Sequence, residues 1–139
     1  MGYSEWRPWV VTLLDTITGL NVYDHPTDDI SYPAAIVKIG EAVPDIDRET
    51  NQSIKRNYEI NIDLVVTASE ELQSSPDTER IFGEMLDSMI EIFDAVENRH
   101  PNDNQASRQR LVRVVPRDSI SPEPKRIATL TLEFYKRNG

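Results

Sequence analysis

The segment "IKRNYEINIDLVVT", residues 54–67, constrains the fold more than any other part of the sequence. Apolar side chains share one face of it, interrupted only by Arg56: Ile54, Tyr58, Ile60, Ile62, Leu64 and Val66. The other face is polar: Lys55, Asn57, Glu59, Asn61, Asp63 and Thr67. Because successive side chains of a strand point to opposite sides of a sheet, this alternation predicts a long strand with one buried and one solvated face. Its length favours a first half that extends past the core, which predicts a projecting loop or hairpin arm at residues 41–56.

Two segments have the spacing of amphipathic helices. Residues 4–18 predict a helix with Ser4 as its N-cap and Gly19 as the residue that ends it. Its apolar stripe is Trp6, Val10, Leu13, Leu14 and Ile17. A second helix is predicted from Ser75, an N-cap followed by Pro76 at the first helical position, to near residue 98. Its apolar stripe is Ile81, Phe82, Met85, Leu86, Met89, Ile92, Phe93 and Val96.

Four more segments predict strands: residues 20–24, 33–40, 109–117 and 126–137. The order of elements is therefore α-β-β-β-α-β-β, which is typical of an α+β fold. We expect one domain over residues 1–139, with two amphipathic helices on one face of an antiparallel or mixed sheet of about five strands.

Composition excludes several classes of protein. The chain has no cysteine, which rules out a disulfide scaffold, a cysteine-based zinc site and a thiol nucleophile. The N-terminus "MGYSEWRPWVV" places Glu5 and Arg7 where a signal peptide would be apolar. No segment approaches the roughly 20 apolar residues of a membrane helix, so no membrane partner is expected. A net charge of −9 argues against a dedicated nucleic-acid-binding protein.

Charge is unevenly distributed along the chain. Residues 1–67 have 11 acidic and 5 basic side chains, residues 68–97 have 9 and 1, and residues 98–139 have 4 and 9. The acidic and basic segments predict a subunit interface, with Arg108, Arg110 and Arg113 facing Glu84, Asp87 and Glu91 of another copy. The alternative is that both segments are solvated surfaces.

The sequence "DHPTDD" gathers Asp24, His25, Asp28 and Asp29, which raises the question of a metal site. The spacing does not match a calcium loop, and adjacent residues of an extended chain point to opposite faces. We interpret the group as a turn that the aspartates shape or cap, with Pro26 and Pro33 on either side of a change of direction. Neither a nucleophile elbow, a phosphate-binding glycine loop nor H-E-x-x-H occurs. We therefore predict no catalytic residue, no metal and no cofactor.

The order of elements resembles the tail terminator proteins of long-tailed bacteriophages, also called minor tail or tail-to-head joining proteins. The passage "NVYDHPTDDISYPAAIVKIGE" has the strand-turn-strand pattern of that family. The matching positions are Val22, Tyr23, Asp24, Pro26, Asp29, Ile30, Pro33, Ala34, Ala35 and Val37.

The resemblance implies a virion structural protein without catalysis. Six copies would form a ring at the head-proximal end of the tail, assembled in the host cytoplasm. This ring would stop growth of the tail tube, bind the tube protein and the head connector, and let DNA pass transiently. A lumen or tube-contacting loop is then predicted at Glu41, Asp45, Asp47, Arg48 and Glu49. Alternatives are a tube-like protein or a head-tail adaptor, and, less favoured, a small enzyme subunit.

Overall fold

The computed structural model describes residues 2–27, 29–44, 56–67, 75–103, 107–119 and 125–136. Its helices are α1 (Tyr3–Leu14) and α2 (Ser75–Asp94), and α2 is followed by the short 3-10 turns η2 (Val96–Asn98) and η3 (Pro101–Asp103). The strands are β1 (Asn21–Tyr23), β2 (Ala34–Pro44), β3 (Arg56–Thr67), β4 (Ser107–Ser119) and β5 (Lys125–Lys136). The predicted order of elements is confirmed.

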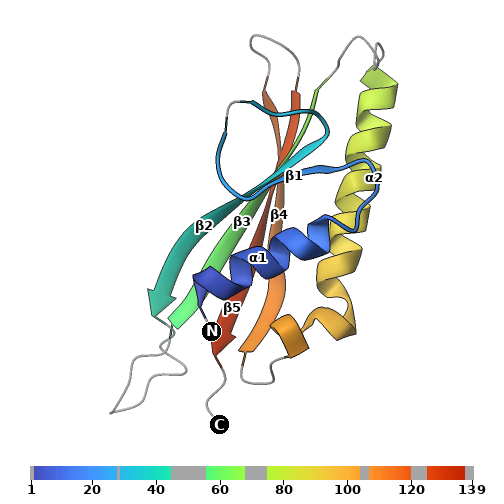
Figure 1. Ribbon diagram of the computed structural model, residues 1–139. Coiled ribbons are helices and arrows are strands. Elements are labelled where there is room, and N and C mark those ends of the chain that lie inside the picture. Colours follow the sequence, from blue (N-terminus) through green and yellow to red (C-terminus); the bar gives the residue numbers. More distant parts are fainter. Residues whose placement is uncertain are drawn as a thin grey trace.

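The five strands form one mixed sheet in the order β1-β2-β3-β5-β4. β1 pairs with β2 in parallel, and every other pair is antiparallel. In Figure 1, α1 crosses one face of the sheet and α2 runs along its side. The predicted α+β architecture with two helices is therefore correct, and the sheet is the mixed one of the two alternatives.

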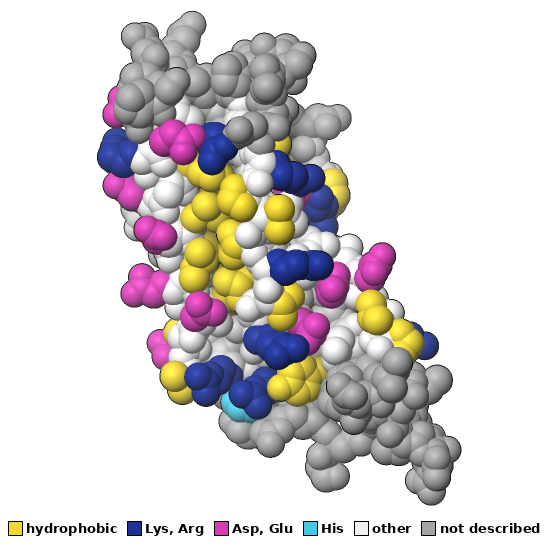
Figure 2. All heavy atoms as spheres, turned by 180° about the vertical axis from the view of Figure 1, so that it is seen from behind, with side chains coloured by type: hydrophobic (Ala, Val, Ile, Leu, Met, Phe, Trp, Pro, Cys, Tyr) yellow, Lys and Arg dark blue, Asp and Glu magenta, His cyan; other side chains and the backbone are white. Residues whose placement is uncertain are grey.

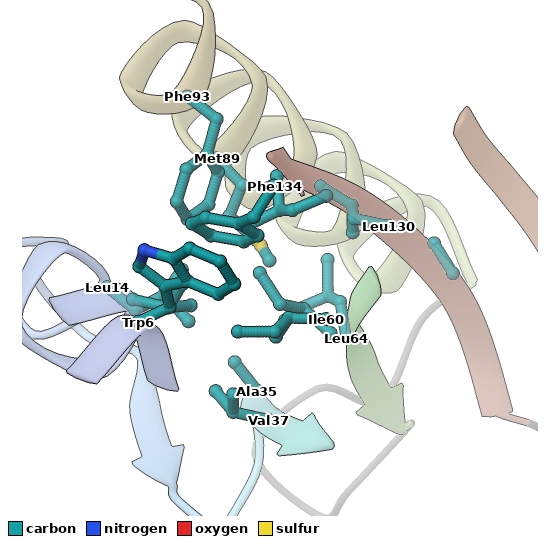
Figure 3. Packing of buried hydrophobic residues seen from close by; sticks show 14 of the residues in the cluster. Trp6, Leu14, Ala35, Val37, Ile60, Leu64, Met89, Phe93, Leu130 and Phe134 are labelled. Atoms are coloured by element: carbon teal, nitrogen blue, oxygen red, sulfur yellow. The ribbon is translucent and has the colours of Figure 1, made fainter. Parts of the chain in front are cut away.

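The core lies between the helices and the alternating apolar face of the sheet. Ile60, Ile62, Leu64 and Val66 of β3 are fully buried, as the alternation in the sequence predicts. Trp6 of α1 stacks on Phe134 of β5, with ring centroids 5.0 Å apart (Figure 3). Met89 and Phe93 of α2 belong to the same buried cluster. Both helices are thus fixed against the central strands β3 and β5.

Helix α1 is shorter than the sequence predicts. It ends at Leu14, because the N–H groups of Thr16 and Ile17 bond the carbonyls of Leu13 and Leu14, three residues back, and so tighten the chain out of the α-helix. Gly19 lies at a φ of +83° in the turn beyond the helix, where an L side chain is strained. The predicted N-cap at Ser4 is also wrong, since Gly2 occupies that position.

Helix α2 ends at Asp94, before the predicted limit near residue 98. Ala95 has an extended backbone, with φ −62° and ψ 139°, and the chain then re-forms a single 3-10 turn as η2. Strand β2 is longer than predicted and continues through Gly40 to Pro44. A Cβ at Gly40 would lie 2.8 Å from Asn61 Nδ2 and 3.1 Å from the Glu59 carbonyl oxygen, so a larger residue would require a shift where β2 passes this close to β3.

We predict that Trp6→Ala lowers the free energy of unfolding by about 3–5 kcal/mol, since it removes a large, fully buried ring and leaves a cavity. Urea unfolding followed by circular dichroism measures the loss. Trp6→Phe is the matched control: it keeps an aromatic ring, and the indole Nε1 it removes has no hydrogen-bond partner among the described residues. Equal losses for the two variants would contradict the role of the stacked ring.

Candidate functional site: two charged surfaces

The predicted interface arginines lie on edge strand β4. Leu111 and Val114 pair with Leu132 and Leu130 and lie on the helix-covered side of the sheet. A bulge between Leu111 and Arg113 shifts the register by one residue. The bulge therefore places Arg113 on the same uncovered face as Arg110, although the two are three positions apart. We call this surface of β4 the arginine face: Arg108, Arg110, Arg113, Val115 and Arg117.

Neighbouring strands supply partners for most of these arginines. Arg110 Nη2 lies 2.9 Å from Glu133 Oε1, and Arg113 Nη2 lies 3.7 Å from Glu59 Oε1. Arg117 donates to Thr129 Oγ1 at 2.8 Å. Sequence reasoning missed these in-chain contacts, because they depend on the pairing of β3, β5 and β4. Arg110 and Arg113 are consequently parts of a cross-strand ladder as well as candidates for an interface.

The ladder continues across the sheet to β2. Thr129 Oγ1 donates to Asp63 Oδ1 at 2.8 Å, and Lys38 forms an ion pair with the same carboxylate. The Thr131 hydroxyl donates to Asn61 Oδ1 at 2.9 Å. These bonds hold the polar side chains of the uncovered face in fixed positions. Figure 2, seen from behind, shows basic side chains beside a band of hydrophobic ones on this side of the molecule.

The predicted acidic partners lie on α2, in the other layer of the molecule. Glu84 and Glu91 line a hollow of about 650 Å³ where the turn after α1 meets α2. Glu84 also pairs with Arg80 at 3.3 Å, one helical turn away, and Asp87 is exposed. The acidic and basic sets are therefore not brought together within one chain. Their contact across a subunit interface stays a prediction.

The predicted turn at "DHPTDD" is part of a longer connection between two parallel strands. Because β1 and β2 are parallel, residues 24–33 must carry the chain back to the start of the next strand. Asn21 Nδ2 donates to the carbonyls of Ser31 and Pro33, and the Ser31 N–H donates to the Tyr23 hydroxyl at 2.8 Å. Among the described residues, Asn21 and Tyr23 thus shape this connection more than the aspartates do.

Asp24 and His25 do not point to opposite faces, which corrects the sequence prediction. His25 Nδ1 lies 2.6 Å from Asp24 Oδ1, since the chain leaves the strand at Tyr23 and bends. The hydrogen bond from His25 is the main cause that lowers the pKa of the Asp24 carboxyl below its usual value. Asp28 lies outside the described residues. Within the described ranges, no group of three or more acidic or histidine side chains could hold a metal ion.

The buried side-chain amide of Gln109, which the sequence pattern did not single out, donates hydrogen bonds near the end of α2. Gln109 of β4 is 2% exposed, and its Nε2 donates to the carbonyls of Phe93, at 2.7 Å, and Asn98, at 3.0 Å. The Phe93 carbonyl lies in the last turn of α2, where carbonyls lack partners within the helix, and Asn98 is the last residue of η2. His100 Nδ1 lies 2.8 Å from the Ser107 carbonyl. Both contacts attach the end of α2 to the start of β4.

The predicted lumen or tube-contacting loop is described only at its start. Glu41 is exposed on β2. Asp45, Asp47, Arg48 and Glu49 lie outside the described residues, as does most of the predicted arm at 41–56. Strands β2 and β3 remain paired out to Pro44 and Arg56, on either side of that segment. Of the helices described, none is long and apolar enough to cross a bilayer.

The fold defines a two-layer α+β domain in which two helices cover one face of the sheet, while the other face has polar side chains beside a band of hydrophobic ones. Comparison with solved structures gives 27 matching chains. One belongs to the structure described as "Virion of native gene transfer agent (GTA) particle", with a TM-score of 0.53 and 12% identity. The match covers 97% of this chain and 99% of that chain, and it shows a shared fold. No protein-family model and no curated protein sequence matches.

We predict that His25→Ala raises the pKa of Asp24 toward its ordinary value, because the variant removes the hydrogen bond that favours the carboxylate. An NMR titration of the carboxyl measures the change. Arg7→Gln is the control and should produce a smaller rise, since Arg7 affects this carboxyl by its charge alone and donates its hydrogen bond to the Asp24 carbonyl. Because the pKa of Asp24 is lowered, the stability that its hydrogen bond with His25 contributes is present above the ordinary pKa of the carboxyl. It is lost as pH falls through the lowered pKa. An unchanged pKa in His25→Ala would contradict this assignment.

We also predict that Gln109→Leu destabilises the protein by about 2–4 kcal/mol, since the carbonyls of Phe93 on α2 and Asn98 on η2 lose their donor. Thermal and urea unfolding measure the loss. Val112→Ala, on the same strand and 37% exposed, is the control and should change stability little. If Gln109→Leu unfolds at the urea concentration of the unmodified protein, the amide does not stabilise the helix end.

Proposed function

We propose that the chain is a structural protein of a phage-like virion. The observation that supports this most is the fold match to a chain of a gene transfer agent virion, which extends over nearly the whole length of both chains. A match of this extent concerns the entire domain, including both helices and all five strands. Coverage of nearly all of both chains favours a common architectural role over the reuse of one small motif.

Within that class, we propose the tail terminator function that the sequence resemblance implies. Six copies would close into a ring at the head-proximal end of the tail tube and join it to the head connector. A ring requires a head-to-tail interface, in which two different surfaces of the subunit fit each other. The hollow lined by Glu84 and Glu91 and the arginine face lie in different layers of the molecule, which supports such an interface.

We propose a structural role without catalysis, because the polar side chains of the uncovered face bond one another. The polar side chains of the uncovered face are engaged with one another in the cross-strand ladder. The acidic segment at residues 41–50, which includes Glu41, is proposed to face the lumen. There it would repel phosphate groups and let DNA slide, since phosphate contacts dominate affinity for DNA.

Electron microscopy of the purified protein, alone and mixed with tail tubes of the same virion, tests this function. We expect closed rings, with one ring bound at one end of each tube. A tube-like protein would instead stack into long fibres, and a head-tail adaptor would bind the connector and leave the tube end free. Either result would contradict the terminator function while leaving the wider virion class in place.

A further inference from the structure

The hollow where the turn after α1 meets α2 combines an apolar floor with an acidic rim. Ile17, Met85 and Ile92 are partly buried and form its floor. Glu84, Glu91 and Glu97 line the same hollow, which we call the acidic groove. Val96, between two of the lining residues, is 68% exposed. A surface of this kind favours an occupant with both positive charge and small apolar side chains.

The arginine face of β4 has those properties. Val115 is 47% exposed, so an apolar side chain accompanies the arginines, and Val112 at the bulge is 37% exposed. Arg110 and Arg113 have carboxylate partners in their own chain. By contrast, Arg117 contacts a threonine hydroxyl, and Arg108 has no polar partner among the described residues. Positive charge therefore remains available near both ends of the strand.

We propose that the acidic groove of one copy receives the arginine face of the next copy, with Arg108 and Arg117 opposite Glu91 and Glu97. This inference rests on the proposed ring and names the two surfaces that would close it. The arginine face belongs to the sheet layer and the groove to the helix layer, so the contact is head-to-tail. Such a contact repeats from copy to copy, and it closes into a ring when the rotation between copies allows.

Charge argues against the symmetric alternatives. Two grooves that faced each other would bring three glutamates of each copy together, and two arginine faces would bring like charges together. Addition of strand to strand at β4 is also disfavoured. The bulge at Leu111/Arg113, Pro116 and the arginines are the features that block edge-to-edge pairing of strands. The contact is consequently one between side chains.

Charge reversal tests this pairing. The groove variant is Glu91→Lys with Glu97→Lys, and the strand variant is Arg108→Glu with Arg117→Glu. These positions avoid Glu84, Arg110 and Arg113, whose in-chain ion pairs would be lost as well. Sedimentation at low salt should show self-association of the unmodified protein, weakened about tenfold or more in each variant. Glu5→Lys with Asp29→Lys has the same charge change as the groove variant, lies outside both surfaces and should associate like the unmodified protein.

Mixing the two variants is the decisive step. In an alternating ring, the new lysines of one variant would face the new glutamates of the other at every second contact, and the contacts between would be the unmodified glutamate–arginine pairs. We therefore expect the mixture to recover assembly, with an even number of copies. The proposed pairing would be overturned if either variant alone associated as strongly as the unmodified protein, or if the mixture stayed monomeric. So would an unmodified protein that stays monomeric at low salt and high concentration.

Cross-linking provides a second measurement that does not depend on variant stability. Because the chain has no cysteine, Glu91→Cys and Val115→Cys each introduce a single thiol. A short bismaleimide should link the two variants to each other faster than it links either one to itself. Equal rates would overturn the pairing. Rings seen on tail tubes together with equal rates would show that the proposed function holds and that only the surfaces are misassigned.

Discussion

The stacking of Trp6 on Phe134 is the contact on which the rest of the structure depends. It fixes α1 to β5, and Phe93 and Met89 of α2 pack into the same buried cluster. Both helices therefore share one face of the sheet, and their burial is the main favourable contribution to folding. The helices leave the other face uncovered, and its polar side chains bond one another in the cross-strand ladder beside a band of hydrophobic ones (Figure 2).

The two charged surfaces follow from this division into layers. The cross-strand ladder neutralises part of the uncovered face, as in the pairs of Arg110 with Glu133 and of Arg113 with Glu59. The acidic groove forms in the helix layer, where the turn after α1 meets α2. A subunit with opposite charges on different layers is suited to repeat head-to-tail. The same feature makes pairing through two identical surfaces unfavourable.

The sequence predicted the elements well because their signals are local. The alternation in residues 54–67 defines the buried face of β3, and helical spacing defines the stripe of α2. Predictions that depend on strand pairing were less successful. The parallel pairing of β1 with β2, the bulge before Arg113 and the ion pairs of the arginines depend on contacts between distant segments. Gln109 was missed for the same reason, since its partners lie on α2 and η2.

The central claim is that this domain assembles head-to-tail through its two layers. A three-dimensional reconstruction of the protein bound at the end of a tail tube tests the claim most directly. The account predicts a closed ring in which the helix layer of each copy faces the uncovered sheet face of the next. A ring in which helix layers face each other, or tubes whose ends remain free of the protein, would contradict it.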